Sequence, residues 1–208
     1  MLWLAVDAEL HERSKGLRSI DDFARVFFAG AEPDAPTRTY TFADICHALN
    51  RVAPSDWEGF LRTWIEGHDE LDTTSGLTRH GWRLIFADVP TAAFQANEEE
   101  GGVVDLTYSI GLAVRADGTV RAVAWDGASY QAGLRPSVRI IAVNAAPYGR
   151  DAILNAVRDS ANHPVVLTVE QDGHRSEVRV RYADTLRYPQ LERIKERPDT
   201  LARLLAAR

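Results

Sequence analysis

The spacing of apolar residues changes part-way along this chain. From residue 1 to about residue 67 they recur every three or four positions, which is the period of a helix buried on one face. Beyond Val103 they alternate with polar residues, and turn signals such as Asp117-Gly118 and Asp172-Gly173 follow at short intervals. The sequence therefore predicts an α+β fold, in which an N-terminal helical bundle fragment precedes a mostly-β domain.

The helical part carries three sequence signals for helix starts. Each is a hydroxyl residue followed three positions later by a carboxylate, an arrangement that satisfies backbone N–H groups at a helix N-terminus. The pairs are Ser19 with Asp22, Thr41 with Asp44, and Ser55 with Glu58. We expect four helices, the second ended by Gly30, and the first beginning beside Met1 without a cap. That uncapped start predicts that the sequence is part of a longer chain.

The segment between the two periodic regions reads as connecting structure. Residues 69–81 show no period, and residues 82–86 predict a short strand. Residues 88–102 contain the acidic run Glu98-Glu99-Glu100 and the pair Gly101-Gly102, which predict an exposed, mobile loop. An acidic run is usually a solvated surface, and a role in binding a metal or a partner is the less favoured reading.

Composition argues against several functional classes. The chain has 208 residues, and its 24 basic residues are scattered among 30 acidic ones, so the net charge is −6 and nucleic acid is a poor partner. No apolar run reaches the roughly 20 residues that a membrane span needs. Cys46 is the only cysteine, which excludes an internal disulfide and a thiolate metal cage.

Catalytic residues are hard to assemble from this sequence. The nearest approach to a zinc-binding His-Glu-x-x-His motif is His11-Glu12-Arg13-Ser14-Lys15, where a lysine replaces the second ligand. Cys46 and His47 are adjacent on a helix and point about 100° apart, so a buried, inert thiol is expected. The other histidines have no ligand spacing and are interpreted as surface or ordinary core residues: His68, His80, His163 and His174.

A candidate binding site lies at the start of the β region. In Tyr108-Ser109-Ile110-Gly111-Leu112, a glycine between two aliphatic residues precedes an extended run through Ala113 and Val114. Consecutive backbone N–H groups near such a glycine form an anion site, and the following strand offers an edge to an extended peptide. This stretch predicts peptide binding, whereas the alternative is that Ile110-Gly111-Leu112 merely begins a core strand.

The order of later segments resembles a bacterial PDZ domain. Ile110-Gly111-Leu112 is followed by a strand, then Ala132-Gly133-Leu134-Arg135-Pro136, then Ile140-Ile141-Ala142-Val143-Asn144. The resemblance implies that loop amides hold a peptide's C-terminal carboxylate, and that a helix over residues 150–160 closes the groove. Ser137-Val138 and Ala145 stand where many members have Gly-Asp and Gly, which puts the turn geometry in doubt. The implied peptide-binding residues are Ser109, Ile110, Gly111, Leu112, Ala113, Val114, Ile153, Leu154 and Val157.

A wider resemblance covers nearly the whole chain. Leu2-Trp3-Leu4-Ala5-Val6-Asp7, Ser19-Ile20-Asp21-Asp22-Phe23-Ala24-Arg25, Tyr40-Thr41-Phe42 and Arg187-Tyr188-Pro189 together resemble the C-terminal part of the glycyl aminopeptidase family, which are PDZ-containing zinc metallopeptidases. The implied domains are a distal part of a thermolysin-like catalytic domain (1–80), a connection (81–102), a PDZ domain (103–183) and a tail (184–208). The resemblance implies zinc in the parent enzyme but no cofactor in this chain.

These readings predict a chain that binds peptides or protein C-termini and packs on the rest of a catalytic domain, without catalysis of its own. A rival reading is a structural or autoregulatory module whose PDZ groove is occupied by the protein's own chain. A third, an enzyme in its own right, requires a zinc site that the sequence does not provide. The sequence does not indicate the compartment, and the resemblance implies a parent enzyme in the bacterial periplasm or the cytoplasm.

Overall fold

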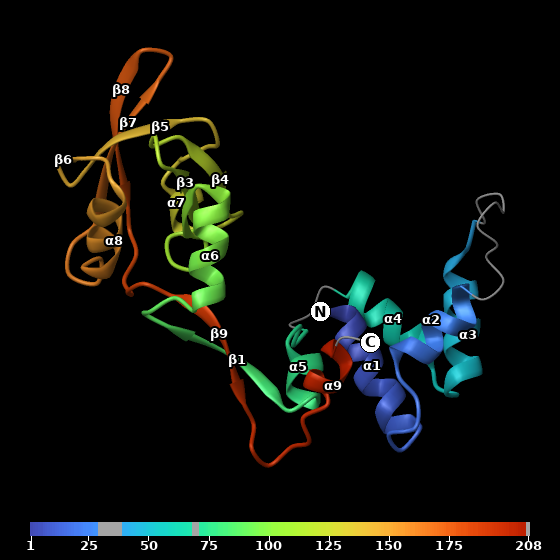
Figure 1. Cartoon of the computed structure of the whole chain (residues 1–208). Helices are drawn as coiled ribbons and strands as arrows, with labels where there is room; N and C mark the ends of the chain where they lie inside the picture. Colours follow the sequence, from blue (N-terminus) through green and yellow to red (C-terminus); the bar gives the residue numbers. More distant parts are fainter. Residues whose placement is uncertain (29–38, 68–70, 207–208) are drawn as a thin grey trace. The chain divides into compact units, whose positions relative to one another are not determined.

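The computed structural model describes residues 1–28, 39–67 and 71–206, and it has the α+β fold expected (Figure 1). The chain divides into two compact units. One contains Met1–Leu84 with Leu191–Arg208, and the other contains Ile85–Gln190. We refer to them as the helical unit and the PDZ-like unit and describe each by itself. Among the described residues, no helix is long and apolar enough to cross a membrane.

The helical unit packs its helices around one apolar cluster. Leu10, Leu49 and Trp57 are fully buried there, and they come from three different helices. Its helices are α1 (Leu2–Arg13), α2 (Ile20–Phe28), α3 (Phe42–Val52), α4 (Trp57–Glu66), α5 (Ser75–Arg79) and α9 (Leu201–Leu205). The predicted three-to-four spacing thus corresponds to real helices with buried faces.

The predicted helix starts are confirmed in part. Thr41 and Asp44 form the reciprocal capping box at α3, as expected. The prediction for α4 is wrong, because Asp56 rather than Ser55 is the cap and its carboxylate accepts the N–H of Gly59 at 3.0 Å. Residues 69–81 are not all connection, because they include α5. Gly30 and His68 lie outside the described residues.

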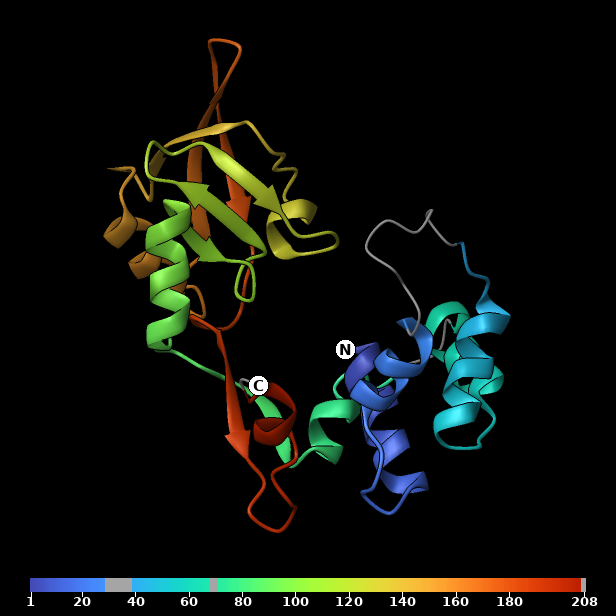
Figure 2. The ribbon, with the colours of Figure 1, turned by 45° about the vertical axis from the view of Figure 1, so that its right-hand side comes forward.

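The PDZ-like unit contains two antiparallel sheets with three helices. Strands β2 (Val103–Leu106), β3 (Leu112–Arg115) and β4 (Val120–Val123) form one sheet in that order. The other sheet has the order β6-β5-β7-β8, and its β7–β8 hairpin extends away from the rest of the unit (Figure 2). The remaining elements are β5 (Arg139–Val143), β6 (Ala146–Pro147), β7 (Val165–Gln171), β8 (His174–Val180), α6 (Ala92–Gly101), α7 (Ala128–Gln131) and α8 (Arg150–Arg158).

Two further strands carry the chain out of the helical unit and back into it. Strand β1 (Trp82–Ala87) pairs with β9 (Tyr188–Arg193) in a two-stranded sheet. The sequence of Tyr188-Pro189-Gln190-Leu191-Glu192-Arg193 predicts a turn, and this is wrong because these residues form β9. A proline is tolerated in this strand because a two-stranded sheet consists only of edge strands.

The expected mobile loop over residues 88–102 is also wrong, because most of it is helix α6. The Thr91 hydroxyl accepts the N–H of Phe94 at 3.2 Å and caps the start of the helix. Gly102 ends it in the left-handed conformation, with φ of 58°. The glycine pair therefore marks a helix C-terminus, and the acidic run precedes it within the helix.

The turn between β5 and β6 has the positive φ angles that glycine usually provides, although it contains no glycine. Asn144 and Ala145 have φ of 47° and 67°, and Val143 pairs directly with Ala146. Two consecutive positive φ angles in a two-residue hairpin define a type I′ turn, for which Asn-Gly is the preferred sequence. Ser137, the other departure from the PDZ pattern, likewise has φ of 72°. The β5–β6 turn therefore forms with Ala145 in a strained backbone conformation.

We expect Ala145→Gly to stabilise the protein by about 0.5–1 kcal/mol, because glycine adopts the left-handed region without a Cβ clash. The measurement is the denaturant midpoint of unfolding. Ala116→Gly is the matched control, since Ala116 is an exposed turn residue outside the positive-φ set and should lose stability or stay unchanged. A loss of stability in Ala145→Gly would show that the positive φ of Ala145 does not strain the native state.

Candidate functional site

The strand predicted to bind a peptide has a partner on each edge. Strand β3 pairs with β4 on one side, where Leu112 lies opposite Val123. On the other side it pairs antiparallel with β2, where Leu106 lies opposite Leu112 and Val104 opposite Val114. The expectation of a free edge at Leu112–Val114 is therefore wrong. A peptide could pair there only if β2 were displaced.

The backbone amides of the predicted anion site are also engaged. The N–H groups of Ser109 and Gly111 both donate to the carbonyl oxygen of Leu106, at 3.0 and 3.1 Å. A terminal carboxylate would need these same donors. Gly111 adopts a left-handed conformation, with φ of 71°, and a Cβ there would lie 3.3 Å from the Ala124 Cβ and the Gly127 Cα. The carbonyl of Leu106 therefore occupies the loop in which exposed amides were expected.

The predicted groove lining belongs to the core of the PDZ-like unit. Ile110, Leu112, Val114, Ile153 and Val157 are each 0% exposed and lie in one apolar cluster. Leu106 and Val104 of β2 are buried in that same cluster. Gly111 and Ala113 are also buried, whereas Ser109 and Leu154 are half-buried. The structure thus brings the predicted residues together, with apolar side chains of β2 among them.

The buried carboxylate of Glu98 holds β2 through a hydrogen bond to its backbone. Glu98 of α6 is 3% exposed; one of its carboxylate oxygens accepts the N–H of Asp105 at 2.7 Å, and the other pairs with Arg150 at 2.5 Å. Arg150 begins α8, the helix predicted to close the groove. Glu98 therefore links α6, β2 and α8, and the expectation that the acidic run is only a solvated surface is wrong for this residue.

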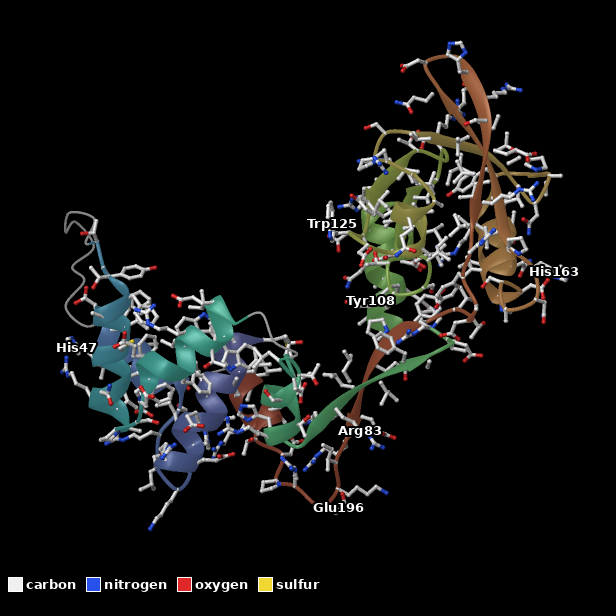
Figure 3. The ribbon with its side chains drawn as sticks, turned by 180° about the vertical axis from the view of Figure 1, so that it is seen from behind. His47, Arg83, Tyr108, Trp125, His163 and Glu196 are labelled. Carbon is white, nitrogen blue, oxygen red and sulfur yellow. The ribbon has the colours of Figure 1, made fainter. Side chains whose placement is uncertain are left out.

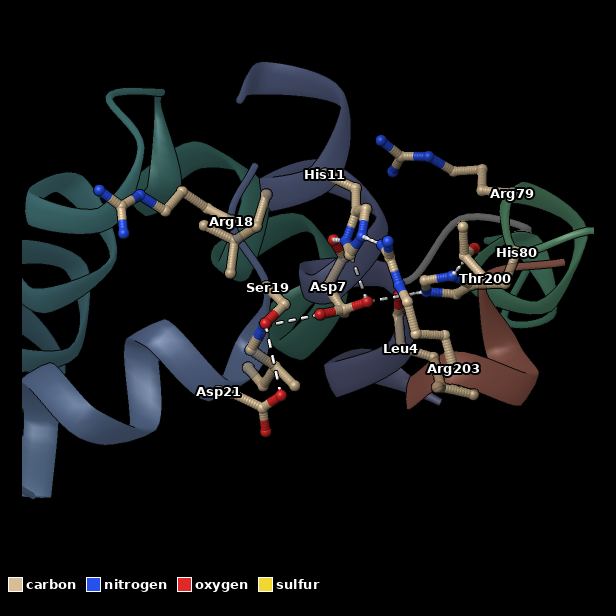
Figure 4. Close-up of polar contacts among 12 residues, drawn as sticks. Leu4, Asp7, His11, Arg18, Ser19, Asp21, Arg79, His80, Thr200 and Arg203 are labelled. Carbon is tan, nitrogen blue, oxygen red and sulfur yellow. Dashed lines mark hydrogen bonds and ion pairs between the residues drawn. The ribbon is translucent and has the colours of Figure 1, made fainter. Parts of the chain in front are cut away.

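A polar cluster in the helical unit was missed by sequence reasoning. Asp7 of α1 is fully buried, and its second carboxylate oxygen, Oδ2, lies 3.4 Å from both His11 Nδ1 and His80 Nε2 (Figure 4). The other oxygen accepts the N–H of Ile20 at 2.6 Å. Residues 7 and 80 share no motif, so the only available signal was Asp7 on the apolar face of a predicted helix.

Cys46 and His47 are adjacent on α3, and the other remaining candidates for chemistry are single exposed histidines. His47, His163 and His174 are exposed, and Figure 3 labels the first two. Cys46 is buried as expected, and that burial raises the pKa of its thiol, which disfavours the reactive thiolate.

The donor set does not fit a catalytic zinc site. Among the residues that the structure describes, no group of three or more histidine, cysteine or acidic side chains is arranged to hold a metal ion. Lys15, which stands in place of a second motif histidine, follows the end of α1 and has φ of 54°. His11 instead directs Nδ1 toward the carbonyl and carboxylate of Asp7. We therefore derive no zinc-dependent step from these residues.

Comparison with known proteins shows similarity of fold. No protein-family model and no curated protein sequence matches the chain. The crystal structure of an aminopeptidase N family protein from Idiomarina loihiensis matches 94% of this chain, with a TM-score of 0.53 and 13% identity. The chain spans 34% of that protein's length. The PDZ domain of HtrA3, bound to a phage-derived ligand, matches 54% of this chain and 91% of its own at 16% identity, but its TM-score of 0.28 supports no argument.

We expect Glu98→Ala to lower the free energy of unfolding by about 2 kcal/mol, because it leaves the partly buried Asp105 N–H without its carboxylate acceptor and breaks the pair with Arg150. Chemical denaturation monitored by circular dichroism measures the change. The matched control is Glu99→Ala, which removes an exposed carboxylate of the same helix and should change stability by less than about 0.5 kcal/mol. Equal effects of the two substitutions would contradict the role given to Glu98.

Proposed function

We propose that this chain is an accessory, non-catalytic part of a larger peptidase, and that its PDZ-like unit is a module closed by its own strand β2. The similarity in fold to about a third of an aminopeptidase N family protein supports the association with peptidases. The helical unit would then pack on the rest of a catalytic domain. Zinc-dependent removal of N-terminal residues from peptides would belong to the longer protein.

The position of Leu106 is the main support for a groove that is closed by strand β2. Its carbonyl accepts the two loop amides, its side chain is fully buried, and its strand occupies the edge of β3. Backbone pairing, loop amides and an apolar slot are the three features by which such a groove would recognise a peptide C-terminus. All three are supplied from within the chain, which favours the structural or autoregulatory reading over an open peptide-binding site.

We expect the purified chain to show no preference for peptides with a free C-terminal carboxylate over their amidated counterparts. A library of both forms, ending in aliphatic residues, is titrated while the backbone amide resonances of Ser109 and Gly111 are followed by NMR. These amides should exchange slowly with solvent because they donate to Leu106. Saturable shifts of both amides with free-acid peptides alone would overturn the closed state.

The non-catalytic part of the proposal has its own test. Aminoacyl p-nitroanilides, glycine among them, are incubated with the chain in the presence of added zinc. We expect no turnover above that of the buffer, because the zinc donors are not assembled. Zinc-dependent turnover that a chelator abolishes would show that the chain is itself an enzyme.

A further inference from the structure

Strand β8 is the exposed edge of the four-stranded sheet. It is last in the order β6-β5-β7-β8, and it pairs with β7 over all seven of its residues without a register shift. The pairing begins at the hairpin that extends away from the rest of the unit (Figure 2). Among the described residues, no strand pairs with the other side of β8. Such an edge presents a row of backbone N–H and C=O groups to which another chain can add a strand.

The register shows which residues of β8 direct their backbone groups to this open edge. Val166 of β7 accepts the N–H of Asn144 at 2.8 Å and donates its own N–H to the Asn144 side chain at 2.9 Å, so both of its backbone groups face β5. Val166 lies opposite Arg179, which therefore directs its N–H and C=O groups away from β7. This direction alternates along a strand, so Arg175 and Glu177 also direct theirs to the open edge.

Charged side chains accompany these open backbone groups. Side chains two residues apart share one face of a strand, and those of Arg175, Glu177 and Arg179 are 69%, 62% and 69% exposed. Arg175 pairs with Glu170 at 3.0 Å and Arg179 with Glu177 at 3.9 Å, but exposed pairs of this kind contribute little to stability. Arginine is in excess along this face, whose charged residues are Arg139, Glu170, Arg175, Glu177, Arg179 and, directly after the strand, Arg181. The edge is thus positive in a chain whose net charge is −6.

The opposite face of β8 holds the strand in register. Val180 is buried in the core of the unit, and Val178 packs against the same core. A shift by one residue would bring charged side chains to that core. Asp172 and Gly173, with φ of 52° and 77°, form a two-residue type I′ turn that fixes the same register. Helix α7 lies beside the C-terminal end of β8, whereas residues 174–177 are exposed, so the edge is an ordered and accessible template.

Charge determines which kind of strand fits this edge. In a second copy paired antiparallel over the full strand, Glu177 would face Glu177 and Arg175 would face Arg179, so every charged pair would be of like sign. An extended segment with carboxylates opposite Arg175 and Arg179, and a basic residue opposite Glu177, would form pairs of opposite sign throughout. Charges on an edge strand also prevent aggregation, and this protective role alone is the alternative that an experiment has to separate.

We propose that the open edge of β8 is a docking site for an extended acidic segment of another protein, which joins the sheet antiparallel as a fifth strand. The backbone groups of Arg175, Glu177 and Arg179 provide the hydrogen bonds, and the two arginines select for carboxylates. The site lies on a different strand from the closed groove at β3. It depends neither on that groove nor on the proposed association with a peptidase.

Titration with a short peptide tests the docking site in the whole chain. The probe has glutamate, lysine and glutamate at alternate positions, separated by threonine and valine, and its ends are acetylated and amidated so that it has no terminal charge. We expect saturable NMR shifts of the Arg175, Glu177 and Arg179 amides and slower exchange of these amides with solvent, because they gain acceptors. The Ser109 and Gly111 amides should not shift, which separates this site from the groove.

A methylated probe separates strand pairing from attraction between charges. N-methylation of its glutamate and lysine residues keeps every charge but removes the N–H groups that would face β8, so binding should weaken at least tenfold. Equal binding of the two probes, or no binding of the first, would overturn the proposal. Shifts of the same amides that depend on protein concentration alone would place a second copy on the edge and would also overturn it.

Substitutions in the chain test the two contributions separately. Arg179→Glu should weaken binding of the probe roughly tenfold, because an attractive cross-strand pair becomes repulsive. Glu177→Pro should abolish binding and leave the unfolding midpoint nearly unchanged, since it removes an N–H directed to the open edge and none that bonds to β7. Arg158→Glu, the same change of charge at an exposed position of α8, should bind like the unchanged chain. Equal weakening by Arg158→Glu and Arg179→Glu, or undiminished binding in Glu177→Pro, would overturn the proposal.

Discussion

The PDZ-like unit depends on the pairing of β2 with β3. Leu106 supplies the carbonyl that the Ser109 and Gly111 amides need and the side chain that fills the adjoining core. Buried N–H groups without acceptors cost about 1–3 kcal/mol each. Removal of β2 would therefore cost free energy twice, because it exposes an apolar slot and takes the acceptor away from the Ser109 and Gly111 N–H groups. The same constraint explains Gly111, because a side chain there would press on Ala124 and Gly127 and distort the loop that receives the carbonyl.

The local parts of this fold could be predicted from sequence because their causes are local. The capping box at Thr41 and the left-handed Gly133 after α7 depend on residues within one turn of the chain. Helix α6 was missed because an acidic run beside two glycines also fits a loop. What distinguishes the two is the burial of Glu98, which depends on Arg150, 52 residues away. No local pattern encodes that pairing.

The candidate site shows the same division between local and distant causes. The sequence placed a candidate loop at Ile110-Gly111-Leu112, and Gly111 in that loop has the positive φ that glycine adopts without a Cβ clash. It did not identify the occupant, because β2 is only four residues long and its register is visible only in the pairing with β3. The Asp7 cluster is a comparable case: each histidine looks ordinary alone, and only packing brings His11 and His80 to one carboxylate.

An internal strand is a demanding competitor for any external peptide. Strand β2 is joined to β3 by residues 107–111, and short tethers give effective concentrations on the order of millimolar. If β2 as a free peptide bound the open groove with a Kd of about 1 μM, tethering it at about 1 mM would lower the apparent affinity of any external peptide about a thousandfold. Glu98 adds to this cost, because β2 cannot leave without giving up the bond to the Asp105 N–H. Resemblance to a peptide-binding fold thus does not establish peptide binding, since the same loop that could hold a terminal carboxylate is already satisfied by the carbonyl of Leu106.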